Sequence, residues 1–136
     1  MTALVIDTSV AAAWCFPDEQ TDFTNGVLIA VAQSLGAYAP RLWAYEIRNC
    51  VLIGLRRQRI TKTDAQDFLA AIDALNVRLL DPLSHDTVFT LAERHNLTFY
   101  DASYLDLAMR RNLPLATLDT AMRRAANQSG VPLFQP

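Results

Sequence analysis

The sequence of 136 residues contains little of what several kinds of protein site depend on. It has only two cysteines, Cys15 and Cys50, and no C-x-x-C spacing, which argues against a disulfide framework and against a zinc site. No apolar run approaches the ~18 residues of a membrane-spanning helix, and no basic segment leads into an apolar one as in a secretory signal. We therefore expect two free, buried thiols in a cytoplasmic protein.

An excess of basic residues is also absent. The chain has 12 Lys and Arg residues against 14 Asp and Glu residues, a formal net charge of -2. That balance argues against coating of nucleic acid by bulk charge, although it allows a local basic rim. The composition, 51% hydrophobic and 19% charged, is typical of a globular protein. No linker, repeat or low-complexity segment divides the chain, so we predict one domain spanning residues 1–136 whose function resides in a local site.

Short apolar strands alternate with helices along the sequence. The first strand, residues 3–6, is apolar on both faces, as in the centre of a parallel sheet. Further strands are predicted at 37–39, 77–80, 115–118 and 131–134. Helices are predicted at 8–16, 18–34, 42–57, 61–75, 84–95, 98–111 and 120–128. Because parallel neighbours need helical crossovers, we expect a three-layer α/β domain with a mainly parallel sheet of about five short strands.

Two acids directly follow predicted strands. Asp7 comes after the first strand and Asp119 after the strand at 115–118, and each precedes a helix. Because the carboxyl ends of parallel strands lie at the same edge of a sheet, where ligands bind in such folds, these two side chains are able to meet. Each one is also well placed to be an ordinary helix cap, and this alternative remains open.

Two further acids lie within predicted helices. The face around Glu46 is mostly apolar, where a carboxylate needs a neutralising partner. Arg41 and Arg48 are not three or four residues away, the spacing at which helix side chains face each other, so we expect a metal or a distant cation to neutralise Glu46. Asp101 lies on the inward face of its helix. Thr98, three residues before it, makes a capping box an equal alternative.

Four segments resemble the motif blocks of PIN-domain ribonucleases. Within that family, the resemblance is strongest to the VapC-type toxins of bacterial toxin–antitoxin pairs. They are IDTSV, APRLWAYEIRNCV, FYDASYLDLAMR and LATLD, in that order. The resemblance covers essentially the whole chain and implies a metal-dependent endoribonuclease. The acids that match the family's catalytic and metal-binding positions are Asp7, Glu46, Asp101 and Asp119. Thr8 and Thr117 match positions at which family members use hydroxyl groups to support the site.

The chemistry of this set of acids favours one class of cofactor. Carboxylates without clustered histidines or thiolates select Mg²⁺ or Mn²⁺, and such an ion activates water and polarises a phosphoryl oxygen. The resemblance further implies an RNA substrate, a cognate VapB-type antitoxin and a homodimer, without membrane association. Asp106 is an extra acid that we expect on the surface. We expect His85 and His95, which lie in a helix distant in sequence from the four blocks, to be solvated or packed.

Basic residues gather in three places: Arg56, Arg57, Arg59 and Lys62 at one helix junction, Arg110-Arg111, and Arg123-Arg124. Most of them are expected to stabilise helix ends, and some to bind phosphates or an acidic partner segment. A phosphoacceptor signalling domain is disfavoured because residues 131–136 contain no lysine. A catalytically silent binding module remains the alternative, and an RNase assay with and without Mg²⁺ separates it from an enzyme.

Overall fold

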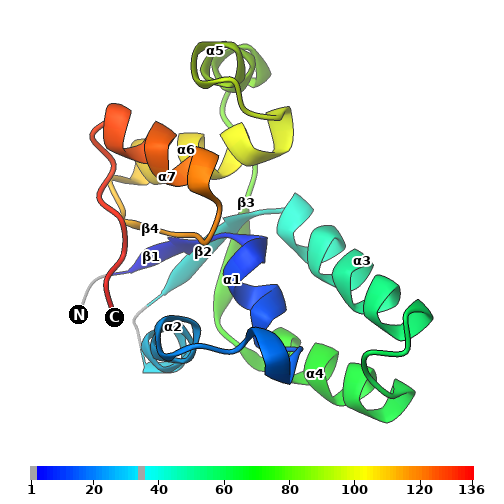
Figure 1. The fold of residues 1–136 in the computed structure, drawn as a ribbon. Helices are drawn as coiled ribbons and strands as arrows, with labels where there is room; N and C mark the ends of the chain where they lie inside the picture. Colours follow the sequence, from blue (N-terminus) through cyan, green and yellow to red (C-terminus); the bar gives the residue numbers. More distant parts are fainter. Residues whose placement is uncertain (1–2, 34–35) are drawn as a thin grey trace.

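A computed structural model describes residues 3–33 and 36–136 (Figure 1). Its strands are β1 (Leu4–Ile6), β2 (Ala37–Pro40), β3 (Val77–Leu80) and β4 (Leu115–Ala116). Its α-helices are α1 (Thr8–Ala13), α2 (Asp22–Gln33), α3 (Leu42–Arg56), α4 (Lys62–Ala74), α5 (His85–His95), α6 (Phe99–Arg111) and α7 (Thr120–Gln128). A short 3-10 helix, η1 (Pro17–Glu19), follows α1. The predicted end of the second helix at residue 34 lies outside the described residues.

The sheet is parallel, in the order β3-β2-β1-β4. Strand β1 is central: Val5 pairs with Tyr38 of β2 on one side and with Leu115 of β4 on the other. Helices α6 and α7 cover one face, and α1, α2 and α4 lie on the other (Figure 1). The predicted three-layer α/β class is therefore confirmed, and so is the burial of the first strand on both faces.

The last two predicted strands are shorter than expected. Strand β4 ends at Ala116 because the next backbone groups turn to side chains: the Leu118 N–H donates to Ser9 Oγ. The segment 131–134 forms only an isolated parallel bridge, between Leu133 and Leu115. Pro132 has no N–H and cannot donate to a strand ladder, which limits that segment to one bridge.

Local capping sets most helix ends. Thr61, Ser84 and Thr98 each accept a hydrogen bond from a backbone N–H three residues later, and for Thr98 this is the capping alternative that the sequence left open. The prediction for 8–16 was wrong at its end, because α1 stops at Ala13 and a turn leads into η1 at Pro17. The prediction for 18–34 began too early, because Thr21 caps α2 through the Thr24 N–H.

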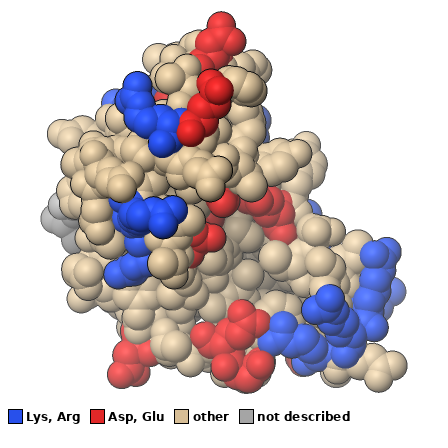
Figure 2. Space-filling model, turned by 45° about the horizontal axis from the view of Figure 1, so that its top comes forward, with Lys and Arg blue, Asp and Glu red and all other residues tan. Residues whose placement is uncertain are grey.

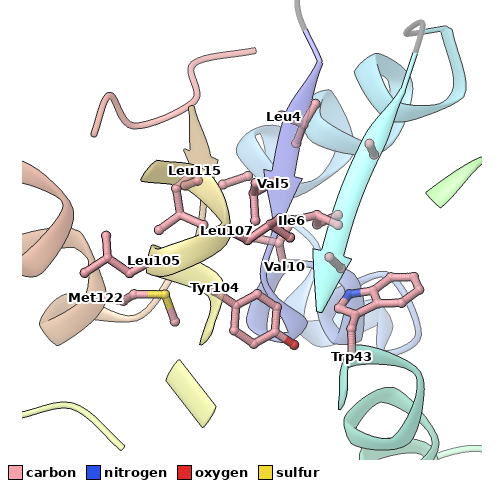
Figure 3. Close-up of a cluster of buried hydrophobic side chains, with 14 of the residues drawn as sticks. Leu4, Val5, Ile6, Val10, Trp43, Tyr104, Leu105, Leu107, Leu115 and Met122 are labelled. Carbon is pink, nitrogen blue, oxygen red and sulfur yellow. The ribbon is translucent and has the colours of Figure 1, made fainter. Parts of the chain in front are cut away.

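The core lies on both sides of β1. Leu4, Val5 and Ile6 are fully buried, and the ring of Tyr104 from α6 belongs to the same cluster, with its hydroxyl at the cluster's edge (Figure 3). Both cysteines are free but only half-buried. No helix in the described part of the chain is both long enough and apolar enough to cross a bilayer.

Asp106 corrects the expectation of a surface acid. Its side chain is buried and forms an ion pair with Arg110, with 2.8 Å between Oδ2 and Nε. Helix α6 packs against the sheet and between α5 and α7, so every residue from 102 to 108 is buried, whichever face of the helix it occupies. A helical face predicted from sequence spacing is exposed only where no neighbouring helix covers it.

The contact between Gly54 of α3 and Phe16 gives the first testable prediction. A Cβ atom at Gly54 would lie 2.5 Å from Cε1 of Phe16, whose buried ring is held beneath the Arg59 guanidinium. We expect Gly54→Ala to lower the free energy of unfolding by about 1–2 kcal/mol, because overpacking exceeds the gain of about 1 kcal/mol in helix propensity. Urea denaturation measures this change.

The control for this prediction is a double-mutant cycle. Phe16→Leu removes the ring atoms that the new methyl group would meet, so Gly54→Ala should cost less in the Phe16→Leu background than in the wild type. A Gly54→Ala variant more stable than the wild type would show that the ring moves aside without cost.

Candidate active site

Asp7 lies at the carboxyl end of β1 and is 5% exposed. It occupies the N-cap position of α1, yet its side chain makes no capping hydrogen bond. Its Oδ2 instead accepts two hydrogen bonds of 2.7 Å, from Ser9 Oγ and from Thr117 Oγ1. The helix-cap alternative therefore does not account for the Asp7 carboxylate, which is held by hydroxyl groups from α1 and from the segment after β4.

Glu46 of α3 is held by a second pair of hydroxyl groups. Its Oε1 accepts hydrogen bonds from Tyr104 Oη at 2.6 Å and from Thr8 Oγ1 at 2.9 Å, and the two hydroxyl oxygens are 2.7 Å apart. The two hydroxyls carry only two hydrogens, so at most two of these three contacts are hydrogen bonds at once. Neither Arg41 nor Arg48 pairs with Glu46, as their spacing predicts. Arg41 pairs with Asp81, which directly follows β3, and Arg48 pairs with Asp73 of α4.

Asp101 and Asp119 begin helices α6 and α7, which pack together. The Asp101 N–H donates to Thr98 Oγ1, and a hydrogen bond between Thr98 and the Asp101 side chain lowers the pKa of that carboxyl. Oδ1 of Asp119 accepts the Met122 N–H at 2.9 Å, so the capping alternative is correct for this oxygen. Asp101 is thus a half-buried carboxylate beside its capping threonine, and Asp119 is a helix cap whose other oxygen accepts no hydrogen bond from the described residues.

The four acids act on one another electrostatically. Burial raises the pKa of Asp7 to about 6, although the hydrogen bonds from Thr117 and Ser9 lower it; the negative charges of Asp101 and Glu46 raise it further. Burial also raises the pKa of Asp101, and the charges of Asp119 and Glu46 add to this effect. The structure therefore brings together, at one edge of the sheet, all four acids that the motif blocks singled out.

The donor chemistry of this cluster fits a hydrated divalent cation. Within residues 3–33 and 36–136, no three carboxylate, imidazole or thiolate groups form a ready-made set of direct metal ligands. Mg²⁺ does not need one, because it keeps several waters and binds through one or two carboxylates. Asp7, Glu46 and Asp119 each have one oxygen fixed by protein donors, while the other accepts no hydrogen bond from a described residue. The acids are therefore oriented but retain oxygens for a cation or its waters.

Two residues of the site were missed from the sequence. Neither Ser9 nor Tyr104 was singled out as a site residue, and the ring of Tyr104 also belongs to the core. The signal for Tyr104 was its position three residues after Asp101 on the same helical face. His85 lies closer to the third motif block than its place in the sequence indicates. Its ring lies against that of Phe99, the first residue of this block, at a centroid distance of 6.2 Å.

A family model of the PIN domain matches residues 4–128 of the chain. Ribonuclease VapC3 from Pyrobaculum aerophilum is 32% identical over 120 residues, which cover 85% of this chain and 88% of that relative. The chain belongs to the PIN-domain family. The residues that the family model matches include all four motif blocks. The resemblance noted in the sequence is therefore confirmed.

Solved structures show the same fold. This PIN domain is similar to PAE2754 from Pyrobaculum aerophilum, with a TM-score of 0.73 and 22% identity over 91% of this chain and 84% of that one. It is also similar to VapC20 from Mycobacterium tuberculosis, a sarcin-ricin loop cleaving toxin, with a TM-score of 0.70 and 16% identity over 98% and 99% of the two chains.

The raised pKa of Asp7 gives a pH-dependent prediction for the metal-free PIN domain. From pH 4 to 6 the unfolded chain ionises Asp7 before the folded chain does, so stability falls as the pH rises. A change in pKa from 3.8 to about 6 corresponds to about 3 kcal/mol, lost in full above pH 6. In EDTA, Asp7→Asn should melt several degrees above the wild type at pH 7 and at about the same temperature at pH 4.

Asp67→Asn is the matched control, because Asp67 is an exposed acid on α4 away from the cluster. Its melting temperature should follow that of the wild type at both pH values. A lower melting temperature for Asp7→Asn than for the wild type at pH 7 would contradict the destabilising role of the buried charge.

Proposed function

We propose that this PIN domain is a metal-dependent endoribonuclease that hydrolyses RNA phosphodiester bonds in the cytoplasm as the toxin of a type II toxin–antitoxin pair. The observation that carries the proposal is the convergence of Asp7, Glu46, Asp101 and Asp119 from four separate segments. The similarity of this PIN domain to Ribonuclease VapC3 over most of both chains also supports the proposal. Clustered carboxylates of this kind suit hydrolysis of a phosphodiester.

The side chains of the cluster have distinct parts in this proposal. A bound Mg²⁺ or Mn²⁺ would lower the pKa of a water molecule and offset charge on the phosphate. Carboxylate oxygens of Asp7, Asp101 and Asp119 would hold that ion or its waters. Glu46 is oriented by Tyr104 and Thr8 through Oε1, so its Oε2 is free to accept a proton from the attacking water.

Unpaired basic side chains support an RNA substrate. Figure 2 shows acidic side chains where the surface recedes at the centre, with basic side chains at the left and at the lower right. Arg56, Arg57 and Lys62, where α3 meets α4, form no ion pair with a described residue, whereas Arg59 is held by Asp18 and Glu19. Exposed, unpaired cations of this kind contact phosphates without reading sequence.

The partners follow from the family. The VapC resemblance implies a VapB-type antitoxin that covers the acidic groove, and a homodimer of the toxin. Exposed apolar side chains on four helices offer surface for such contacts, among them Tyr45 and Leu52 on α3 and Met109 on α6.

Cleavage of single-stranded RNA by the purified protein tests the proposal. We expect cleavage with Mg²⁺ or Mn²⁺ and none in EDTA. Asp7→Asn, Glu46→Gln, Asp101→Asn and Asp119→Asn should each lower the rate at least tenfold, and gel electrophoresis of the products measures it. Asn is nearly as good a helix cap as Asp, so Asp119→Asn tests the chemistry of that side chain rather than its cap.

The exposed Asp67→Asn variant should cleave at the wild-type rate. Full activity in EDTA would sink the metal-dependent mechanism. RNA binding without cleavage under any metal would identify the chain as a silent binding module instead.

Growth of a bacterial culture tests the toxin role. Expression of the wild type should arrest growth, Asp7→Asn should not, and co-expression of the cognate antitoxin should restore growth, because RNA cleavage stops protein synthesis. Optical density over time measures the effect. Normal growth with abundant, folded wild-type protein would count against the toxin role even if the purified protein cleaves RNA.

A further inference from the structure

A small pocket of about 190 Å³ lies beside the first turns of α3 and α6, at the carboxyl ends of β2 and β3. Its lining includes the side chains of Leu42, His85, Phe99, Tyr100 and Ser103, together with the ion pair of Arg41 and Asp81. Its volume is below the ~300–1,000 Å³ of pockets that enclose a drug-sized ligand. A single planar ring group is therefore the kind of ligand that fits it.

The pocket adjoins the acidic cluster. Leu42 is one helical turn before Glu46 on α3, and Tyr100 is one turn before Tyr104 on α6, a rise of about 5.4 Å on each helix. Glu46 and Tyr104 are joined by a 2.6 Å hydrogen bond. The pocket therefore lies one helical turn from the acidic cluster along both α3 and α6. A strand with its phosphate at the acids has its neighbouring base at the pocket.

The lining has the chemistry of a base-binding site. Tyr100 is 63% exposed although it is a large aromatic residue next to Asp101, and Phe99 beside it lies against the His85 ring. Exposed rings stack on unpaired bases. The ion pair of Arg41 with Asp81 offers donors and acceptors without net charge, which suits a neutral base better than a phosphate or a charged peptide.

We propose that this pocket holds one unpaired RNA base next to the scissile phosphodiester, with Tyr100 stacked on the base, so that the pocket selects the nucleotide at that position. The inference rests on the proposed ribonuclease function and extends it from the acids to the choice of RNA. It makes Tyr100 a specificity-determining residue, and it limits the substrate to strands in which that base is unstacked.

A double-mutant cycle between the protein and its RNA tests this inference. The probe is a fluorescent single-stranded RNA oligonucleotide, with an abasic nucleotide placed at each position in turn, and binding is measured in EDTA so that the proposed cleavage does not occur. For the wild type, one abasic position should weaken binding on the order of tenfold, because the stacked base is lost. Tyr100→Ala should weaken binding of the intact RNA about equally and show no further loss at that position.

Two variants act as controls. Tyr100→Phe keeps the ring and should bind as the wild type does. Phe89→Ala removes an aromatic side chain of similar exposure from α5 that lies outside the pocket, and it should keep the wild-type abasic profile. Thermal melts of Tyr100→Ala, Tyr100→Phe and Phe89→Ala check that each variant is folded. Because Tyr100 is exposed, we expect its replacement to leave the fold intact.

Each outcome bears on one proposal. A uniform loss for Tyr100→Ala at every abasic position, no loss at all, or a wild type that binds no single-stranded RNA would overturn the base pocket. Loss of antitoxin binding by Tyr100→Ala with RNA binding unchanged would assign the pocket to a peptide and overturn it too. A positive abasic profile without Mg²⁺-dependent cleavage would support the pocket and reject the ribonuclease.

Discussion

The burial of the Asp7 carboxylate at the end of the central strand is the constraint on which the rest of the structure depends. A charge in an apolar environment is costly unless donors hold it, and here Ser9 and Thr117 do so at a single oxygen. Ser9 also accepts the Leu118 N–H, so one group of polar contacts ties α1 to the segment after β4. The same hydrogen bonds that make burial tolerable thus fix the relative positions of β1, β4 and α1.

A second network does the same for the helices. Thr8 and Tyr104 hold one oxygen of Glu46, which links α1, α6 and α3 at the carboxyl edge of the sheet. In both networks the protein binds one carboxylate oxygen, and the other accepts no hydrogen bond from the residues that the structure describes. Preorganised acids of this kind favour a cation and its waters, at the expense of mutual repulsion in the metal-free protein.

Charge on the surface is divided between structure and recognition. Arg41, Arg48, Arg59 and Arg110 pair with acids and support the fold locally. The other basic residues where α3 meets α4 form no ion pair with a described residue and lie at the opposite end of α3 from Glu46, whereas the aromatic pocket lies at the first turns of α3 and α6. In the proposed function, a protein of net charge -2 would use separate surfaces for phosphates, for a cation and for a neutral base.

The sequence by itself determined the features that depend on local interactions. The alternation of strands and helices, the caps at Thr61 and Thr98, and the placement of Asp7 and Asp119 after parallel strands all follow from neighbours a few residues apart. Only the tertiary structure decided that Asp106 is buried, that the Tyr104 hydroxyl meets Glu46, and that segment 131–134 forms a single bridge. These depend on which elements pack together, and residues as far apart as Thr8 and Tyr104 carry no periodic signal of their contact.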